Sequence, residues 1–262
     1  MIKNDAIDNG QGFDWGRTSA DYGQFRDIYP EAFYQKILSL GLCTKGQRVL
    51  DLATGTGVLP RNLYRYGARF TGADIAENQI AEARRLSQGM EIDYIVSPAE
   101  ELDFPDGSFD TVTACQCFQY FNLPVLLPKV AKMLRPGGRF GIFFMAWLPE
   151  ESDIVRQSEA LVLKFNPGWT GRGFKRHPVA DPEWASPLFE VESREAFDLA
   201  VPFTRESWNG RMRACRGIGA SLPDDQIAQF DREHRAMLEK IAPENFNIPH
   251  YATMLILRVH LR

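Results

Sequence analysis

The sequence predicts an α/β fold built around an open, doubly wound parallel sheet. An apolar, strand-like run ending at Leu52 enters a glycine-bearing turn at residues 53–57, and an amphipathic helix follows at residues 58–66. About twenty residues after the turn, a second strand-like run ends in Asp74. This order of elements, with an acid at the end of the second strand, fits one βαβ unit.

The turn itself favours a nucleoside ligand. Ala53, Gly55 and Gly57 have little or no side chain, so a ligand can approach the main chain and the positive end of the helix. Pro60 occupies the third glycine position of a dinucleotide fingerprint, and no P-loop lysine follows the turn. We therefore expect a ligand without a pyrophosphate, with Asp74 on its ribose hydroxyls. The alternative is a purely structural turn.

The composition of the chain limits its expected size class and the kinds of ligand that it can bind. The 262 residues are 44% hydrophobic, which fits one sizeable domain or one domain plus a cap. The net charge of −4 gives no reason to expect a nucleic-acid partner. Cysteines 43, 115, 117 and 215 lack zinc-ligand spacing, so we expect reduced thiols, mostly buried, and no metal. Cys115 and Cys117 are predicted on the same face of one strand.

No apolar run reaches membrane-spanning length, and the N-terminus is polar. We expect a soluble cytoplasmic protein with no membrane partner, either a monomer or a homodimer. Residues 1–14 are expected to be disordered or loosely attached.

The first half of the chain continues the alternation of strand and helix. Helices are expected at residues 30–40, 58–66, 80–89 and 123–134, and strands at 48–52, 70–74, 92–96, 109–115 and 140–147. The run Arg135-Pro136-Gly137-Gly138 is expected to separate the last of these helices from the fifth strand.

The alternation lapses between residues 148 and 187, where we expect a helical cap insertion. A helix at 152–165 precedes a flexible loop at 166–178, whose cations either meet an anionic substrate or are solvated. A sixth strand at 189–201 follows. Two further helices, one capped by Thr204 and one starting at Pro223, and a last strand at 250–259 complete the chain. His234 is expected to lie along the second of these helices.

Four stretches resemble the class I S-adenosylmethionine-dependent methyltransferases, particularly the small-molecule, type 11 branch related to the ubiquinone and menaquinone C-methyltransferases. They are Asp51-Leu52-Ala53-Thr54-Gly55-Thr56-Gly57, Gly72-Ala73-Asp74-Ile75, the run from Ala99 to Asp110, and Leu134-Arg135-Pro136-Gly137-Gly138-Arg139-Phe140. The resemblance covers residues 20–147 and implies S-adenosylmethionine as the cofactor. It also implies a Rossmann-like sheet of strand order 3-2-1-4-5-7-6, with the last strand antiparallel.

The strand–helix pattern and the resemblance together predict a division of the chain into four parts. Residues 1–30 would be an N-terminal segment or lid, and 31–147 the cofactor-binding core. Residues 148–187 would be the cap insertion, and 188–262 would complete the sheet.

The resemblance also implies which residues form the site. The cofactor-binding residues would be Asp51, Ala53, Thr54, Gly55, Gly57, Asp74, Ile75, Ala99, Glu100, Cys115, Gln116 and Tyr22. From their places at the end of the fourth strand, at the end of the fifth strand and in the loop at 166–178, rather than from the resemblance, the candidate substrate-binding residues are Gln119, Tyr120, Trp147 and His177. Tyr22 would lie near the methionine end of the cofactor, unless it packs on the sheet. The pair Ala99 and Glu100 would touch the adenine, unless it is a solvated turn.

The catalytic residues stay unassigned. Many similar sequences carry a histidine beside an aromatic residue at the end of the fourth strand, where this chain has Gln119-Tyr120. Tyr120, His177 and Glu183 are the candidate bases, and none is singled out by its spacing.

We expect a methyltransferase that transfers a methyl group to a small organic acceptor by in-line displacement, a reaction in which positioning supplies most of the catalysis. The alternatives are a non-catalytic protein that binds the cofactor and an NAD-dependent oxidoreductase. A quinone-like phenol, a carboxylic acid or an amine would each be a compatible acceptor. Trp147, Trp169, Phe174 and Trp184 favour a flat or apolar one.

Overall fold

A computed structural model describes residues 3 and 5–260 of the chain. These form two compact units, each assembled from separate stretches of the chain. Unit 1 comprises Met1–Ile28, Ala146–His177 and Asp198–Tyr251. Unit 2 comprises Tyr29–Met145, Pro178–Phe197 and Ala252–Arg262.

The strands form a seven-stranded sheet of order β3-β2-β1-β4-β5-β7-β6, as the resemblance predicts. They are β1 (Arg48–Leu52), β2 (Arg69–Asp74), β3 (Ile92–Val96), β4 (Phe109–Cys115), β5 (Leu134–Trp147), β6 (Phe189–Thr204) and β7 (Asn245–Val259). Strands β3, β2, β1, β4 and β5 are parallel neighbours.

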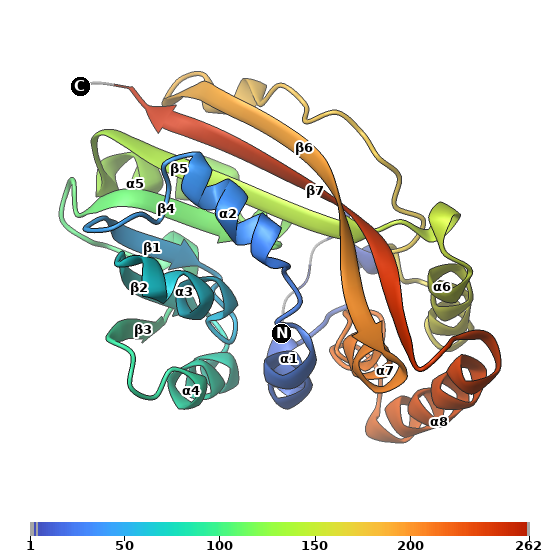
Figure 1. The fold of residues 1–262 in the computed structure, drawn as a ribbon. Helices are drawn as coiled ribbons and strands as arrows, with labels where there is room; N and C mark the ends of the chain where they lie inside the picture. The colour runs from blue at the N-terminus through green and yellow to red at the C-terminus, as the bar shows by residue number, and fades with distance from the viewer. Residues whose placement is uncertain (1–2, 4, 261–262) are drawn as a thin grey trace. The chain divides into compact units, whose positions relative to one another are not determined.

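Strand β7 runs against its neighbours (Figure 1). The backbone amide of His260, just after β7, donates a hydrogen bond to the carbonyl of Leu188, just before β6, at 3.1 Å. The end of β7 therefore lies beside the start of β6. This confirms the predicted antiparallel last strand.

The helices follow the predicted order. They are α1 (Ser19–Phe25), α2 (Glu31–Ser39), α3 (Val58–Leu63), α4 (Glu77–Leu86), α5 (Leu123–Met133), α6 (Asp153–Phe165), α7 (Arg205–Arg213) and α8 (Asp224–Ile241). Thr204 caps α7 as expected, because its hydroxyl accepts from the amide of Ser207 at 3.0 Å. All of these helices are too short or too polar to cross a lipid bilayer.

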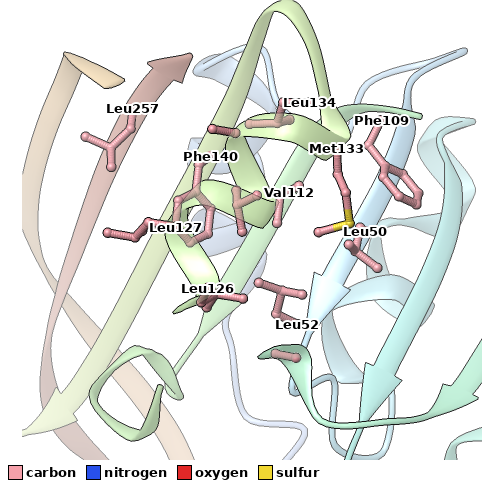
Figure 2. Close-up of a cluster of buried hydrophobic side chains, with 14 of the residues drawn as sticks. Leu50, Leu52, Phe109, Val112, Leu126, Leu127, Met133, Leu134, Phe140 and Leu257 are labelled. Carbon is pink, nitrogen blue, oxygen red and sulfur yellow. The ribbon is translucent and has the colours of Figure 1, made fainter. Parts of the chain in front are cut away.

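In unit 2, helices α2 and α5 cover opposite faces of the sheet (Figure 1). Leu126 and Leu127 of α5 belong to one buried cluster with Leu52 and Phe140 (Figure 2). On the other face, Phe33 of α2 packs edge-on against Phe143 of β5, with ring centroids 6.3 Å apart. Strand side chains alternate between faces, so each strand serves both layers.

The fifth strand starts earlier than predicted. Phe109 pairs with Leu134, but Thr111 already pairs with Arg139, so the residues between form an irregularity in β5. Gly137, at φ +74°, supplies the left-handed residue of this bulge. The run Arg135-Pro136-Gly137-Gly138 is thus part of the strand rather than a break before it.

The prediction that Cys115 and Cys117 lie on the same face of one strand is wrong. Strand β4 ends at Cys115, and Gln116 adopts φ +65°, so Cys117 leaves the strand. Its thiol donates to the carbonyl of Leu52 at 3.3 Å. All four cysteines are free thiols, and three of them are buried.

The N-terminal segment is packed rather than loose. Phe13 is buried, and the Asp8 carboxylate pairs with Arg216 at 2.7 Å. Asp8 also accepts from the amide of Thr170 at 2.7 Å. The expectation of a loosely attached segment is wrong for its described residues, because a polar sequence can still dock through a few buried contacts.

Candidate cofactor site

The turn after β1 is built from left-handed residues. Ala53, Gly55 and Gly57 have φ values of 48°, 57° and 72°. Ala53 is notable because residues with a Cβ rarely adopt this conformation. The amide of Thr54 donates to the carbonyl of Ala73 in β2 at 2.9 Å, which ties the turn to the neighbouring strand. The main chain is thereby fixed at the start of α3.

Asp74 lies at the carboxyl end of β2 and is 9% exposed. One carboxylate oxygen accepts from the amide of Gly55 at 2.9 Å, and the other accepts from the amide of Ala76 at 2.8 Å. Burial raises the pKa of this carboxyl above its ordinary value, against the effect of these two bonds. Each carboxylate oxygen has two acceptor sites, so the group retains capacity for a pair of ligand hydroxyls.

Asp51 lies beneath the turn and is fully enclosed. Its carboxylate accepts from the hydroxyl of Thr54 at 2.6 Å and from that of Thr113 in β4 at 2.7 Å. Burial raises the pKa of Asp51 to about 6; the two hydroxyls oppose this rise and the charge of Asp74 adds to it. Two carboxyls thus lie close together at the ends of neighbouring strands.

The side chain of Tyr94, on β3, packs closely against the glycine of the turn. A Cβ on Gly57 would lie 2.2 Å from the Tyr94 hydroxyl oxygen, and a Cβ on Gly72 would lie 2.9 Å from the ring. The hydroxyl is hydrogen-bonded to that of Ser87 at 2.8 Å. Both glycines are therefore required by close approach.

An apolar surface adjoins Asp74. Ile75 is 56% exposed, and Val96, next to Asp74 across the sheet, is 45% exposed. Ala99 is buried in a short 3-10 turn, whereas Glu100 accepts from the amide of Asn122 at 2.8 Å. The Glu100 carboxylate thus also anchors the start of α5.

The carboxyl end of β4 carries four predicted residues. The thiol of Cys115 contacts the hydroxyl of Tyr29 at 3.4 Å, and the side-chain amide of Gln116 donates to the carbonyl of Met145. Gln119 and Tyr120 follow in a 3-10 turn, where Gln119 donates to the carbonyl of Gln116 at 3.3 Å. The left-handed φ of Gln116 turns the chain out of the sheet.

Tyr22, Trp147 and His177 belong to unit 1. Trp147 is buried, and its indole N–H donates to Glu159 at 2.7 Å. The carbonyl of His177 accepts from the hydroxyl of Tyr251 at 2.9 Å. Tyr22 accepts from Arg26 at 3.1 Å.

The loop at residues 166–178 is held by specific contacts. Trp169 is buried, Lys175 pairs with Glu150 at 2.6 Å, and Arg176 pairs with Glu151 and with Asp198. These acidic partners already neutralise the two cations, which weakens the idea that they meet an anionic substrate.

Sequence reasoning missed three residues that shape the candidate cofactor site. Thr113 supports Asp51, Tyr94 fills the space beneath the turn, and Tyr29 contacts Cys115. Thr113 carried a signal, since it is a polar residue within an apolar strand. Tyr94 and Tyr29 carried none, because their roles depend on contacts that the sequence pattern does not encode.

No three histidine, cysteine, aspartate or glutamate side chains within residues 3 and 5–260 gather closely enough to hold a metal ion. The polar groups at the strand ends are carboxylates, which accept hydrogen bonds, and backbone amides, which donate them. These groups suit ribose hydroxyls and an adenine edge.

Comparison with known proteins agrees with this chemistry. Residues 50–142 match the methyltransferase domain family. The chain is 39% identical over 110 residues to a demethylmenaquinone methyltransferase of Thermus thermophilus, covering 40% of this chain and 50% of that protein. It is 35% identical over 103 residues to a ubiquinone biosynthesis O-methyltransferase of Nitrosococcus oceani, covering 38% of this chain and 43% of that one.

The chain spans about half the length of these curated relatives. A solved structure of a candidate methyltransferase from Bacillus halodurans superposes with a TM-score of 0.53 at 17% identity. The match covers 87% of this chain and 98% of that one, and it supports the fold. With the strand order, the acid after β2 and the matched domain in agreement, residues 50–142 form a methyltransferase domain of the class I S-adenosylmethionine-dependent type.

Proposed function

We propose that this protein transfers a methyl group from S-adenosylmethionine to a small organic acceptor by in-line displacement. The observation that carries the proposal is the position of Asp74, fixed by the amides of Gly55 and Ala76 at the carboxyl end of β2. Ligands of open α/β sheets bind at this edge, and an acid here accepts ribose hydroxyls.

The residues of unit 2 fit the cofactor. Asp74 would hold the ribose, the exposed side chain of Ile75 would cover one face of the adenine, and Ala99 would adjoin it. The backbone at Gly55 and Gly57 would lie against the ligand, because no Cβ intervenes. Asp51 would act on the cofactor's cationic end through the hydroxyls of Thr54 and Thr113.

The cofactor supplies an electrophilic methyl group, whose bond to sulfur breaks as an electron pair of the acceptor attacks it. The protein's own contribution is mainly to hold the acceptor in line and to exclude water. His234 and His250 are buried within unit 1, so neither is offered as a base. Tyr120, His177 and Glu183 stay the candidates if the acceptor must lose a proton.

Calorimetric titration with S-adenosylmethionine, S-adenosylhomocysteine and NAD tests the proposal. We expect both adenosyl compounds to bind and NAD not to bind. Asp74→Ala should weaken their binding by roughly 1.5–3 kcal/mol, the scale of hydrogen bonds to a charged group. Asp74→Asn should lose only part of this binding free energy. Asp93→Ala, which removes an exposed acid on β3, should bind the adenosyl compounds as tightly as the wild type does.

Unchanged affinity in Asp74→Ala would remove the ribose role, and binding of NAD alone would indicate an oxidoreductase. Formation of S-adenosylhomocysteine with any acceptor would establish turnover. Tight binding without turnover across phenols, carboxylic acids and amines would instead support a non-catalytic protein that binds the cofactor.

A further inference from the structure

Unit 1 contains a cavity whose lining includes none of the residues assigned to the cofactor or to the acceptor. Its volume is about 470 Å³, which lies within the range of roughly 300–1,000 Å³ that is typical of small-molecule sites. One wall is formed by the 3-10 turn Trp15–Thr18 and the start of α1, and another by the first half of α8. Arg213, at the end of α7, and Gly219 complete the lining. The cavity is therefore large enough for a small organic molecule and belongs to a single unit.

Three arginines and three aspartates line this cavity, and all three aspartates are already paired. The carboxylate of Asp21 accepts two hydrogen bonds from the guanidinium of Arg213, both at 2.6 Å. Arg213 also pairs with Asp231. Asp224 pairs with Arg17 at 2.7 Å. Because each of these acids has a cationic partner within the protein, the lining offers little attraction to a cationic ligand.

Arg232 is the charged residue of the lining that lacks such a partner. It is exposed on α8, and it forms no hydrogen bond or ion pair with residues 3 or 5–260. The unmatched charge of the cavity is thus positive, so the ligand that it attracts is an anion. A guanidinium presents paired N–H groups in one plane, and these match the two oxygens of a carboxylate.

Apolar side chains adjoin this guanidinium. Ala228 lies about one helical turn before Arg232 and is exposed, and the half-buried Ile227 precedes it. Residues four apart lie on the same face of a helix, so Ala228 and Arg232 are neighbours in the lining. The two apolar side chains offer a surface to an aliphatic group beside the charge. This feature favours an organic carboxylate over an inorganic anion.

The wall around Arg213 is held in one arrangement. The guanidinium carbon of Arg213 lies 5.7 Å from the ring centroid of Phe25, while Asp21 binds its N–H groups. The amide of Gly219 donates to the carbonyl of Arg213 at 3.0 Å. A Cβ on Gly219 would lie 2.5 Å from that carbonyl oxygen and 2.8 Å from the methyl carbon of Thr18. Because these contacts fix the wall in advance, a ligand can bind with little reorganisation of the protein.

We propose that this cavity binds a small organic carboxylate. The carboxylate pairs with Arg232, and a short aliphatic body lies against Ile227 and Ala228. The site does not depend on the proposed function, because it lies within unit 1 and includes none of the residues assigned to S-adenosylmethionine or to the acceptor. It is a binding site additional to those that methyl transfer requires.

NMR titration of the full, isotope-labelled chain at pH 7.5 tests the proposal, with hexanoate as the probe. We expect hexanoate to shift the amide resonances of residues 224–232 in a saturable way. Hexanamide, its uncharged counterpart, should bind at least about 5-fold more weakly, because it cannot form the ion pair. Inorganic phosphate has the charge but no aliphatic body, and it should also bind more weakly than hexanoate.

Two substitutions locate the ligand in the cavity. Arg232→Met removes the charge but keeps an unbranched side chain, and it should weaken hexanoate binding about 5-fold or more. Ala228→Phe fills the space beside the guanidinium without changing the charge and should weaken binding to a similar degree. Arg232→Lys keeps the charge without the planar fork and should retain part of the affinity. Both positions are exposed, so we expect the variants to fold, which circular dichroism verifies.

Each substitution has a matched control in unit 1. Arg156→Met removes an exposed arginine of α6 that does not line the cavity. Ala236→Phe adds the same bulk at an exposed position of α8 outside the lining. Both controls should bind hexanoate as the wild type does.

Failure of hexanoate to bind the wild type would overturn the proposal, as would equal affinity for hexanamide and hexanoate. Unchanged affinity in Arg232→Met or in Ala228→Phe would place the ligand elsewhere and would overturn it too. Phosphate that binds as tightly as hexanoate would overturn the assignment of an organic carboxylate.

Discussion

Asp51 and Thr113 are joined by a hydrogen bond of 2.7 Å between two neighbouring strands. They are register partners of β1 and β4, and the Asp51 carboxylate is buried beneath the turn that adjoins Asp74. The bond stabilises the charged form of a carboxyl whose burial favours the neutral one. The conformation of the turn is therefore stabilised by the buried Asp51 carboxylate, and the charged form of that carboxylate is stabilised by the Thr113 hydroxyl.

We expect Thr113→Val to lower the free energy of unfolding by about 1–3 kcal/mol, because one carboxylate oxygen loses its partner. The loss should also raise the pKa of Asp51 further above its present value. Urea unfolding at pH 7.5 measures the stability. Thr111→Val is the matched control, since Thr111 is equally buried on the same strand but its hydroxyl bond is long, at 3.4 Å. Equal losses in both variants would contradict the role of Thr113.

The approach of Tyr94 to the turn predicts a second effect. Gly57→Ala should be strongly destabilising and should weaken the binding of S-adenosylhomocysteine, because the new Cβ would meet the Tyr94 hydroxyl at 2.2 Å. Gly89→Ala isolates the backbone cost, since Gly89 also has a positive φ but open space around it. That cost is about 1–2 kcal/mol. Thermal unfolding of the two variants should show the larger loss for Gly57→Ala, and equal losses would remove the argument from close approach.

His234 of α8 predicts a pH dependence of stability. Asn209 donates to Asp231 at 2.6 Å, so its carbonyl oxygen faces Nδ1 of His234 at 2.7 Å, and this nitrogen must carry the proton. Burial lowers the pKa of His234 to about 3. The unfolded chain therefore binds a proton below pH 6.5 that the folded protein does not bind until about pH 3.

The fold should accordingly lose stability through this group as the pH falls from 6.5 towards 3, by roughly 1–3 kcal/mol between pH 6.5 and 4. Urea unfolding at several pH values measures the slope. His234→Gln, which has a donor and an acceptor but no titration, should show a shallower slope than the wild type. The exposed His260→Gln serves as control. A slope in His234→Gln that equals that of the wild type would contradict this assignment.

The positions of the turn and of the acid after β2 were predictable for a local reason. The turn at residues 53–57 and the acid Asp74 are encoded by short sequence patterns, and a parallel sheet brings the carboxyl ends of its strands to one edge. Pattern alone could not show that Gly57 is required by Tyr94, nor that Asp51 depends on Thr113. Those relationships join residues that are far apart in the chain, and only the register of the strands brings them together.

The N-terminal segment and the loop at 166–178 show more clearly which contacts a sequence pattern cannot predict. Their polar, glycine-containing sequences predicted loose attachment or flexibility, yet Asp8 joins them through Thr170 and pairs with Arg216. The cations of that loop were also open to two interpretations until Lys175 and Arg176 were found paired with acids. Composition reports the polarity of such segments but not which partners they meet.

The sequence by itself determined the fold class, the strand order through its resemblance, and the edge of the sheet that carries Asp74, because hydrophobic periodicity and short turns are local properties. Only the tertiary structure decided that the guanidinium of Arg211 lies over the ring of Trp147 and that Glu159 accepts a hydrogen bond from the indole N–H of that ring. These residues come from distant parts of the chain. Their chemistry arises from burial and proximity, which no single stretch of sequence contains.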